Sequence, residues 1–280
     1  MQNERVGLFD QWLSIIETTR SSRTFDFYSQ VVREVTQVIG NPKEWGTKAV
    51  SDYLNWLRTK GNSDRSRNTK LQIVRSFVTW AKKRRKLPSH VVDSIPKKIS
   101  YMPAPPVVAT VEEVDKLIVA LQPEPEALLA VLLMADAGLR EGEVRSLQWE
   151  NVKDNVIRVL GKGGKYREVP VLTDRLSTLL SEGLDKHPHD SYIVPGKTGG
   201  EVTRGVIGKR IRNGCIRAKI RPLNPHSFRH CFAIRSVKNN VATPLIQRAL
   251  GHSSLETTSM YLRGLDGDLE ALKEGYANFR

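Results

Sequence analysis

The feature that most constrains the fold is an uninterrupted run of nine apolar residues, Ala127–Ala135, that ends at Asp136. A helix needs about 20 apolar residues to cross a bilayer, so this run is too short to span a membrane. A helix that is apolar on every side is instead buried inside a protein. We therefore predict a buried helix over residues 124–137. The chain has 280 residues, which is enough for two ordinary domains with cores of their own.

The front of the chain carries apolar side chains at helical spacing. This periodicity predicts four helices, at Leu8–Thr19, Phe25–Ile39, Thr47–Thr59 and Thr69–Arg85. The segments GNPKEWG and KGNSDRSRN between them have the composition of turns. Residues 88–109 contain five prolines and show no sustained period. We therefore predict a helical domain over residues 1–103, a linker over 104–109 and a second domain over 110–280.

The second domain begins with a helix signal and then changes period. TVEE at its start predicts a capping box, in which Thr110 caps the helix and Glu113 bonds back to it. A further helix is predicted to begin near Glu141. NVIRVL and YREVPV have the pattern of short strands, joined by the glycine-rich hairpin turn GKGGK, and SYIVP is a candidate third strand. Four helical segments follow over residues 203–261. The fold class predicted is mainly α with a small antiparallel β-sheet.

The charge of the chain points to an acidic polymer as its partner. The net charge is +14, and residues 1–103 account for +10 of it, with 19 lysines and arginines against 9 acidic residues. Nucleic acid fits this charge better than a membrane surface, because no basic amphipathic anchor is present. The basic run KKRRK at 82–86 is either a solvated helix end or a direct phosphate contact. We expect residues 1–103 to act as an electrostatic clamp on nucleic acid.

Cysteine content and the N-terminal sequence indicate the compartment. The chain has two cysteines, Cys215 and Cys231, which form no CxxC pair and no disulfide framework. The first residues show no apolar stretch behind a basic region, so we expect no signal peptide. These features predict a cytoplasmic protein that contacts no membrane.

Nucleotide and metal sites are not expected. GKGGKYR lacks the GxxxxGK[ST] pattern of a phosphate loop, and the triplet at 196–198 has Ser191 where that pattern needs glycine. His187 and His189 have no cysteine or carboxylate pair at ligand spacing. No acidic cluster suggests two-metal chemistry. We predict no cofactor and no metal, so any cleavage of nucleic acid must use positive side chains to offset the phosphate charge.

Six residues of the second domain have side chains suited to chemistry on a phosphate: Arg140, Lys162, His226, Arg229, His252 and Tyr261. Taken singly, each also fits an ordinary role. Arg140 fits a surface pair with Glu143 at i,i+3, and Lys162 fits a solvated hairpin lysine. His226 fits a helix cap after Pro225, and the other histidine fits a helix-start residue. The tyrosine, nine residues after that histidine, fits a core aromatic with its hydroxyl at the rim.

The combination resembles the tyrosine recombinase (phage-type integrase) family. The boxes GLREGEV, GKGGKYREVPV, HSFRH and ALGHSSLETTSMY occur in this order and spacing, and the similarity covers nearly the whole chain. The resemblance is to a Xer-like minimal two-domain site-specific recombinase. It implies a helical, SAM-like core-binding domain in front and a catalytic domain behind. It also implies that all six residues are catalytic. Lys165 competes with Lys162 for the hairpin-lysine role, and His230 is taken as structural.

The resemblance also implies the chemistry and the partners. Tyr261 would attack a phosphate of double-stranded DNA and form a 3′-phosphotyrosyl intermediate, in integration, excision or resolution of DNA elements. The C-terminal tail would dock on a neighbouring protomer and give a homo-tetramer on synapsed sites, with accessory DNA-bending or directionality proteins as further partners. Two alternatives stay open: a catalytically silent sequence-specific regulator, and a type IB topoisomerase.

Overall fold

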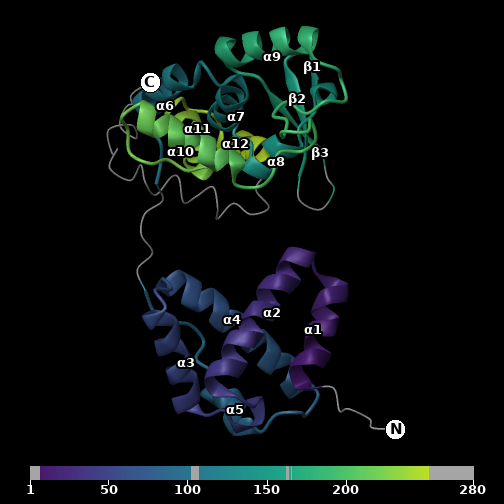
Figure 1. Ribbon diagram of the computed structural model, residues 1–280, viewed down its shortest axis with the longest axis vertical. Coiled ribbons are helices and arrows are strands. Elements are labelled where there is room, and N and C mark those ends of the chain that lie inside the picture. Colours follow the sequence, from purple (N-terminus) through teal and green to yellow (C-terminus); the bar gives the residue numbers. More distant parts are fainter. Residues whose placement is uncertain (1–6, 102–106, 162–163, 165, 252–280) are drawn as a thin grey trace, which may run out of the picture. The chain divides into compact units, whose positions relative to one another are not determined.

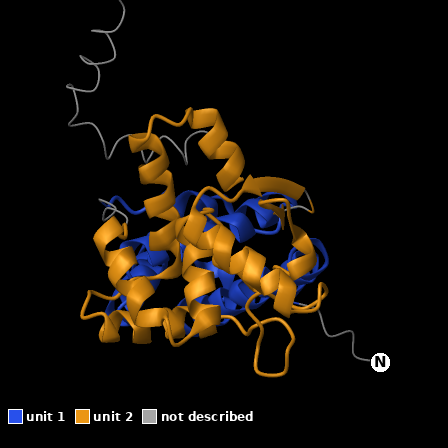
Figure 2. Ribbon diagram, turned by 90° about the horizontal axis from the view of Figure 1, so that it is seen from above, with its two compact units in different colours: residues 1–105 blue, residues 106–280 orange. Residues whose placement is uncertain are grey.

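The computed structural model describes residues 7–101, 107–161, 164 and 166–251, and it divides the chain into two compact units (Figure 2). The first unit comprises residues 1–105 and the second comprises residues 106–280. The first has a hydrophobic core of its own, and the second has a large core and a small one. None of the described helices has the length and apolar character needed to cross a bilayer.

The first unit is helical. Its elements are α1 (Leu8–Thr19), α2 (Ser22–Ile39), the 3₁₀ turn η1 (Pro42–Glu44), α3 (Thr47–Thr59), α4 (Asp64–Lys83) and α5 (Ser89–Ser94) (Figure 1). Phe77 of α4 is fully buried at the centre of an aromatic cluster. Its ring lies 5.5 Å from that of Trp12 in α1 and 6.1 Å from that of Trp45, which follows η1. The periodicity that predicted these helices therefore marks their core-facing sides.

Three boundaries in this unit differ from the prediction. α2 and α4 begin three and five residues earlier than expected, because Ser21 and Ser63 accept hydrogen bonds from backbone N–H groups and act as N-caps. Most of KGNSDRSRN is therefore helix rather than turn. α4 ends at Lys83 instead of Arg85, whose φ of +52° leaves the helical region. α5 lies inside the proline-rich segment, where no element was predicted.

The second unit packs its helices around one buried helix. The helices are α6 (Val111–Leu121), α7 (Pro125–Ala135), α8 (Glu141–Ser146), α9 (Asp174–Lys186), α10 (Val206–Arg217), α11 (Pro225–Lys238) and α12 (Thr243–Leu250). Every side chain of Ala127–Ala135 is buried, and α6, α8, α9, α10 and α11 all contact α7 (Figure 1). The predicted buried helix is confirmed. So is the capping box between Thr110 and Glu113 at the start of α6.

A small antiparallel sheet completes this unit. After the turn η2 (Trp149–Asn151), strands β1 (Val152–Lys153), β2 (Val156–Leu160) and β3 (Tyr166–Pro170) pair in the order β1-β2-β3. The predicted hairpin is β2 and β3, with Leu160 opposite Tyr166. The predicted third strand SYIVP was wrong. Its Tyr192 and Pro195 make only isolated bridges, and the third strand is the two-residue β1. α9 had no counterpart in the prediction. The fold is mainly α with a small antiparallel sheet, as expected.

A buried carboxylate ties the end of α7 to two other helices. Asp136 is fully buried and accepts hydrogen bonds from Arg175 of α9, from Arg235 of α11 and from Thr173. Burial tends to raise the pKa of Asp136, but the bonds from the two arginines outweigh it and hold this pKa below its usual value. The turn that follows α7 therefore starts from a fixed point.

The close packing of α9 on Trp149 gives a test of the second core. A methyl carbon added at Gly183 would lie 2.0 Å from Cη2 of the buried Trp149 ring. We predict that Gly183→Ala destabilises the fold by roughly 1–3 kcal/mol, because the ring or the helix must shift. The control is Gly208→Ala in α10, where the added carbon meets only Pro225, at 3.8 Å. Urea denaturation of the full chain measures both, and equal stability of the two variants would contradict this packing.

Candidate active site

Two arginines from separate elements meet at one pocket of the second unit. The pocket has a volume of about 230 Å³ and is lined by Leu139, Arg140, Glu141, Asn224, Pro225, His226 and Arg229. The structure thus brings together three of the six residues singled out from the sequence. The other three, Lys162, His252 and Tyr261, lie outside the described residues, as does Lys165.

Arg229 is a buried guanidinium held by backbone carbonyls. It lies in the first turns of α11 and is 1% exposed. Its Nη1 donates to the carbonyl of Gly138 and its Nη2 to the carbonyl of Leu250, both at 2.5 Å. Such bonds are needed because burial of an unpaired charge is costly. Gly138 has a φ of +67°, and a Cβ there would lie 2.6 Å from Phe232, so only glycine fits.

Arg140 stands at the N-cap of α8 and reaches two partners. Its Nη1 donates to Oε1 of Glu143 and its backbone N–H to Oε2, each at 2.8 Å, while Nη2 donates to the carbonyl of Gly251 at 2.9 Å. The pair with Glu143 exists, but it is not the ordinary surface pair that the spacing allows. The arginine side chain is 38% exposed and the carboxylate only 7%. The buried Glu143 therefore anchors a guanidinium that stays accessible.

Arg167 is a residue of this region that the sequence analysis missed. It lies in β3 and makes a two-pronged ion pair with Glu143, from Nη1 to Oε1 and from Nη2 to Oε2, both at 2.8 Å. Its Nε donates to the carbonyl of Ala249 at 2.8 Å. Burial tends to raise the pKa of Glu143, but the bonds from Arg167 and Arg140 hold this pKa below its usual value. The only sequence signal for Arg167 was its place in YREVPV, two residues after Lys165.

The end of α12 is where the arginines converge. Its last turn presents the carbonyls of Ala249, Leu250 and Gly251 to Arg167, Arg229 and Arg140, one carbonyl to each. Carbonyls at a helix C-terminus lack partners within the helix and carry the negative end of its dipole, so they attract cations. Gly251, with a φ of +60°, closes the helix in the left-handed conformation. Three guanidinium groups thus hold the chain immediately before His252.

His226 is exposed at the start of α11, next to a second imidazole. Asn224 caps this helix by accepting from the N–H groups of His226 and Ser227, so the alternative that His226 is the cap was wrong. The rings of His226 and His230 lie 4.2 Å apart, edge to face. Burial, with the charges of His226 and Arg229, lowers the pKa of His230 to about 4. His230 is therefore a neutral neighbour of His226 at neutral pH.

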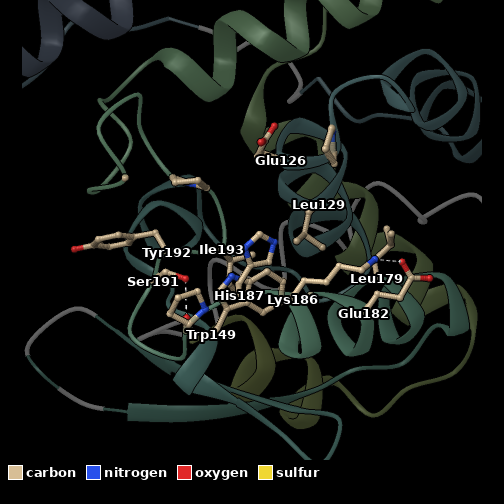
Figure 3. A pocket seen from close by; sticks show the side chains of 15 residues that line it. Glu126, Leu129, Trp149, Leu179, Glu182, Lys186, His187, Ser191, Tyr192 and Ile193 are labelled. Carbon is tan, nitrogen blue, oxygen red and sulfur yellow. Dashed lines mark hydrogen bonds and ion pairs between the residues drawn. The ribbon is translucent and has the colours of Figure 1, made fainter.

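A larger pocket lies elsewhere in this unit and contains none of the six residues. Its volume is about 540 Å³, and it is bordered by the start of α7, by Trp149, by α9 and by residues 187–199 (Figure 3). His187 stacks on Trp149 at 5.3 Å, and Lys186 pairs with Glu182. Among the described residues, no group of three or more histidines, cysteines and acidic residues is placed to hold a metal ion. The pocket lined by Arg140, His226 and Arg229 is the candidate active site, because three of the six residues lie there and none lies in the larger pocket.

Comparison with known proteins decides the family. The model of the phage integrase family matches residues 108–267. The chain belongs to this family. The tyrosine recombinase XerD of Pseudomonas putida is 30% identical over 246 residues, which cover 81% of this chain and 80% of XerD. The tyrosine recombinase XerC of Histophilus somni is 31% identical over 215 residues, which cover 73% of this chain and 72% of XerC.

Solved structures of integrases share the fold. A lambda integrase (75–356) dimer bound to a COC′ core site matches with a TM-score of 0.77 at 19% identity, covering 91% of this chain and 93% of that chain. The site-specific recombinase XerH bound to its difH substrate matches with a TM-score of 0.69 at 19% identity, covering 92% and 79%. The two-unit, mainly helical architecture is therefore that of an integrase.

The buried imidazole of His230 predicts how stability depends on pH. Because its pKa is about 4 in the folded chain and about 6.5 in an unfolded one, the unfolded chain binds the proton more tightly. Stability is then lost as the pH falls from about 6.5 to about 4. We predict that His230→Gln loses less melting temperature between pH 7.5 and pH 5 than the wild type. His90→Gln, at an exposed position of α5, is the control and should follow the wild type. An unchanged pH dependence in His230→Gln would contradict the prediction.

Proposed function

We propose that this chain is a site-specific DNA recombinase that cleaves and rejoins DNA strands through a covalent 3′-phosphotyrosyl intermediate. The observation that carries the proposal is the convergence of Arg140, His226 and Arg229 on one pocket. Membership of the phage integrase family supports the same function. So do the tyrosine recombinases XerC and XerD, whose similarity extends over more than two thirds of this chain.

The two arginines would bind the phosphate that reacts. A guanidinium presents a planar pair of donors that matches two phosphate oxygens, a geometry that lysine does not reproduce. Arg140 and Arg229 line the same pocket from different elements, so the charges of both would act on one phosphate bound there. They would stabilise the charge that grows on the non-bridging oxygens as a fifth oxygen approaches phosphorus. His252 would donate a further hydrogen bond to the phosphate and help to position it.

Tyr261 would be the nucleophile. Its phenol oxygen forms a bond to phosphorus while the bond from phosphorus to the 5′ oxygen breaks. The phenol proton passes to His226, whose exposed position at the pocket allows it to act as general base. Lys162 protonates the departing 5′ oxygen. Attack by the 5′ hydroxyl of the other strand then releases the tyrosine. The phosphodiester energy is kept in the covalent link, so the proposed exchange uses neither ATP nor a metal ion.

DNA is the proposed partner, with the two predicted domains acting together. A lambda integrase tetramer bound to a Holliday junction is similar in fold to this chain, with a TM-score of 0.73 at 18% identity. We propose that residues 1–103 bind the core site with their positive charge and that residues 110–280 cleave it, with residues 104–109 as the linker. The active form would be a homo-tetramer on synapsed sites, joined through the C-terminal tails. Integration, excision and resolution are the candidate outcomes, with accessory DNA-bending or directionality proteins as possible partners.

The cysteines support an intracellular place of action. Cys215 and Cys231 are both unpaired and buried. Thiols persist in a reducing compartment. We propose that the enzyme acts in the cytoplasm.

Covalent trapping tests the proposed function. A duplex that the protein binds is selected from a random pool and nicked beside its central phosphates, so that the cleaved fragment diffuses away and the adduct persists. We predict that the wild type forms a protein–DNA adduct that resists denaturation and that Tyr261→Phe forms none, because phenylalanine has no oxygen to attack with. Tyr192→Phe, in the same unit, is the control and should react like the wild type.

The other outcomes separate the alternatives. A regulator would bind the duplex and form no adduct with any variant. A topoisomerase would form the adduct and also relax plasmids that lack the selected site. Either result would refute the recombinase, and an adduct with Tyr261→Phe would refute the choice of nucleophile.

A further inference from the structure

Arg167 connects three elements that carry the candidate site. It lies in β3, opposite Val159 of β2, on the strand that follows the hairpin turn containing Lys162. Its side chain is 11% exposed, so it is shielded from solvent and not a surface arginine. Its Nη1 and Nη2 donate to the carboxylate of Glu143 in α8, and its Nε donates to the carbonyl of Ala249 in α12. None of the roles proposed above for the reaction uses this residue.

Glu143 gives these contacts their consequence, because two arginines share it. Each carboxylate oxygen accepts one bond from Arg167 and one from Arg140. The carboxylate is buried, so it keeps its charge only while cations surround it. Loss of Arg167 would leave the single partner Arg140, which is partly exposed. The orientation of the Arg140 guanidinium therefore depends on a side chain that does not line the pocket.

The contact with α12 extends this dependence to a second part of the site. Arg167 holds the carbonyl of Ala249, and Arg140 holds the carbonyl of Gly251 directly before His252. A Cβ on Gly251 would lie 3.1 Å from Cδ of Arg167, so the two residues are in close contact. A shift of β3 would therefore move the end of α12 as well as Glu143.

We infer that Arg167 is a positioning residue for DNA strand cleavage, which aligns Arg140 through Glu143 and fixes the end of α12 ahead of His252. The inference rests on the proposed recombinase function. Arg167 would thus couple β3, Arg140 and the end of α12, which leads to His252. A misplacement of catalytic groups by about 1 Å can reduce a rate by ~10²-fold without loss of binding.

Arg145 offers a matched control in the same unit. Its Nε donates to the backbone carbonyl of Val202 at 2.8 Å and its Nη2 to the carboxylate of Glu201. Arg145 makes one bond to a carbonyl and one to a carboxylate, where Arg167 makes one and two, and its bonds reach neither Glu143 nor α12. If the role of Arg167 were purely structural, its loss would lower stability and leave the cleavage rate of the folded protein close to that of the Arg145 variant.

The experiment compares Arg167→Met with Arg145→Met on the nicked duplex described above. We expect the single-turnover cleavage rate of Arg167→Met to fall by ~10²-fold, while its dissociation constant for the duplex stays within about threefold of the wild type. Arg145→Met should keep both values, and its melting temperature should fall by less than that of Arg167→Met, because its partner Glu201 is 42% exposed and Glu143 only 7%. Equal cleavage rates in the two variants, or a loss explained by weaker binding alone, would overturn the inference.

Two further variants keep the inference testable if Arg167→Met folds poorly. Arg167→Lys keeps the charge but cannot make all three contacts, so its rate should lie between those of the wild type and Arg167→Met. A full wild-type rate in Arg167→Lys would contradict the geometric part of the inference. Because Arg167 acts through Glu143, Glu143→Gln combined with Arg167→Met should lose little more than the worse single variant. Multiplied losses would show that the two residues act independently.

The pH dependence of cleavage gives a readout that a structural role would not move. Without Arg167, burial raises the pKa of Glu143 with less opposition, and a protonated Glu143 holds Arg140 less well. The acid limb of the rate profile should therefore lie at higher pH in Arg167→Met than in the wild type and in Arg145→Met. An unmoved acid limb would count against the coupling. If the wild type itself forms no adduct, the proposed function is refuted together with this inference. If the wild type forms the adduct and Arg167→Met cleaves as fast as Arg145→Met, only this inference is refuted.

Discussion

The contact on which the candidate site depends is the capture of one helix end by three arginines. Consecutive carbonyls at the C-terminus of α12 accept from Arg167, Arg229 and Arg140, which come from β3, α11 and α8. Three like charges at one place repel one another, and the carboxylate of Glu143 and the negative end of the helix dipole offset part of this repulsion. With Glu141 also lining the pocket, the described groups are three guanidiniums against two carboxylates, and a DNA phosphate would offset the remaining positive charge.

The scaffold behind this contact is built from a second buried carboxylate. Asp136 is bonded by Arg175 and Arg235, and Glu143 by Arg140 and Arg167, so each acid is held by two arginines. Three of these arginines come from other elements, and Arg140 precedes Glu143 by three residues. Between the two acids lies the left-handed turn at Gly138, whose carbonyl accepts from Arg229. The buried helix α7 ends where this turn begins. Burial of the apolar run Ala127–Ala135 thus also fixes the turn at Gly138, where the site begins.

The sequence predicted most of what depends on neighbouring residues, apart from two helix starts, and missed what depends on distant ones. The buried helix, the capping box at Thr110 and the β2–β3 hairpin follow from local patterns, and the structure has all of them. The early starts of α2 and α4 were missed because a serine reads as a turn residue until its cap bond is seen. The prediction of a strand at SYIVP was wrong because a short apolar run does not specify whether a partner strand is available.

The candidate site was predictable in part for the same reason. Arg140, His226 and Arg229 were named from sequence boxes, and the structure brings them to one pocket. Arg167 was not, because a charged residue in a short strand has no meaning until its partners, 24 and 82 residues away, are known. The catalytic roles of all six residues stay predictions, and Lys162, His252 and Tyr261 lie outside the described part of the chain.

The central claim is that the guanidinium groups of Arg140 and Arg229 act on one phosphate by offsetting its charge. The direct measurement is cleavage by Arg140→Ala of a duplex whose scissile phosphate is replaced by an uncharged methylphosphonate. Loss of a preorganised donor costs ~10²–10³ in rate on the normal diester. We predict that on the neutral linkage Arg140→Ala recovers most of this loss and cleaves at a rate close to that of the wild type. An equal loss on both linkages would contradict it.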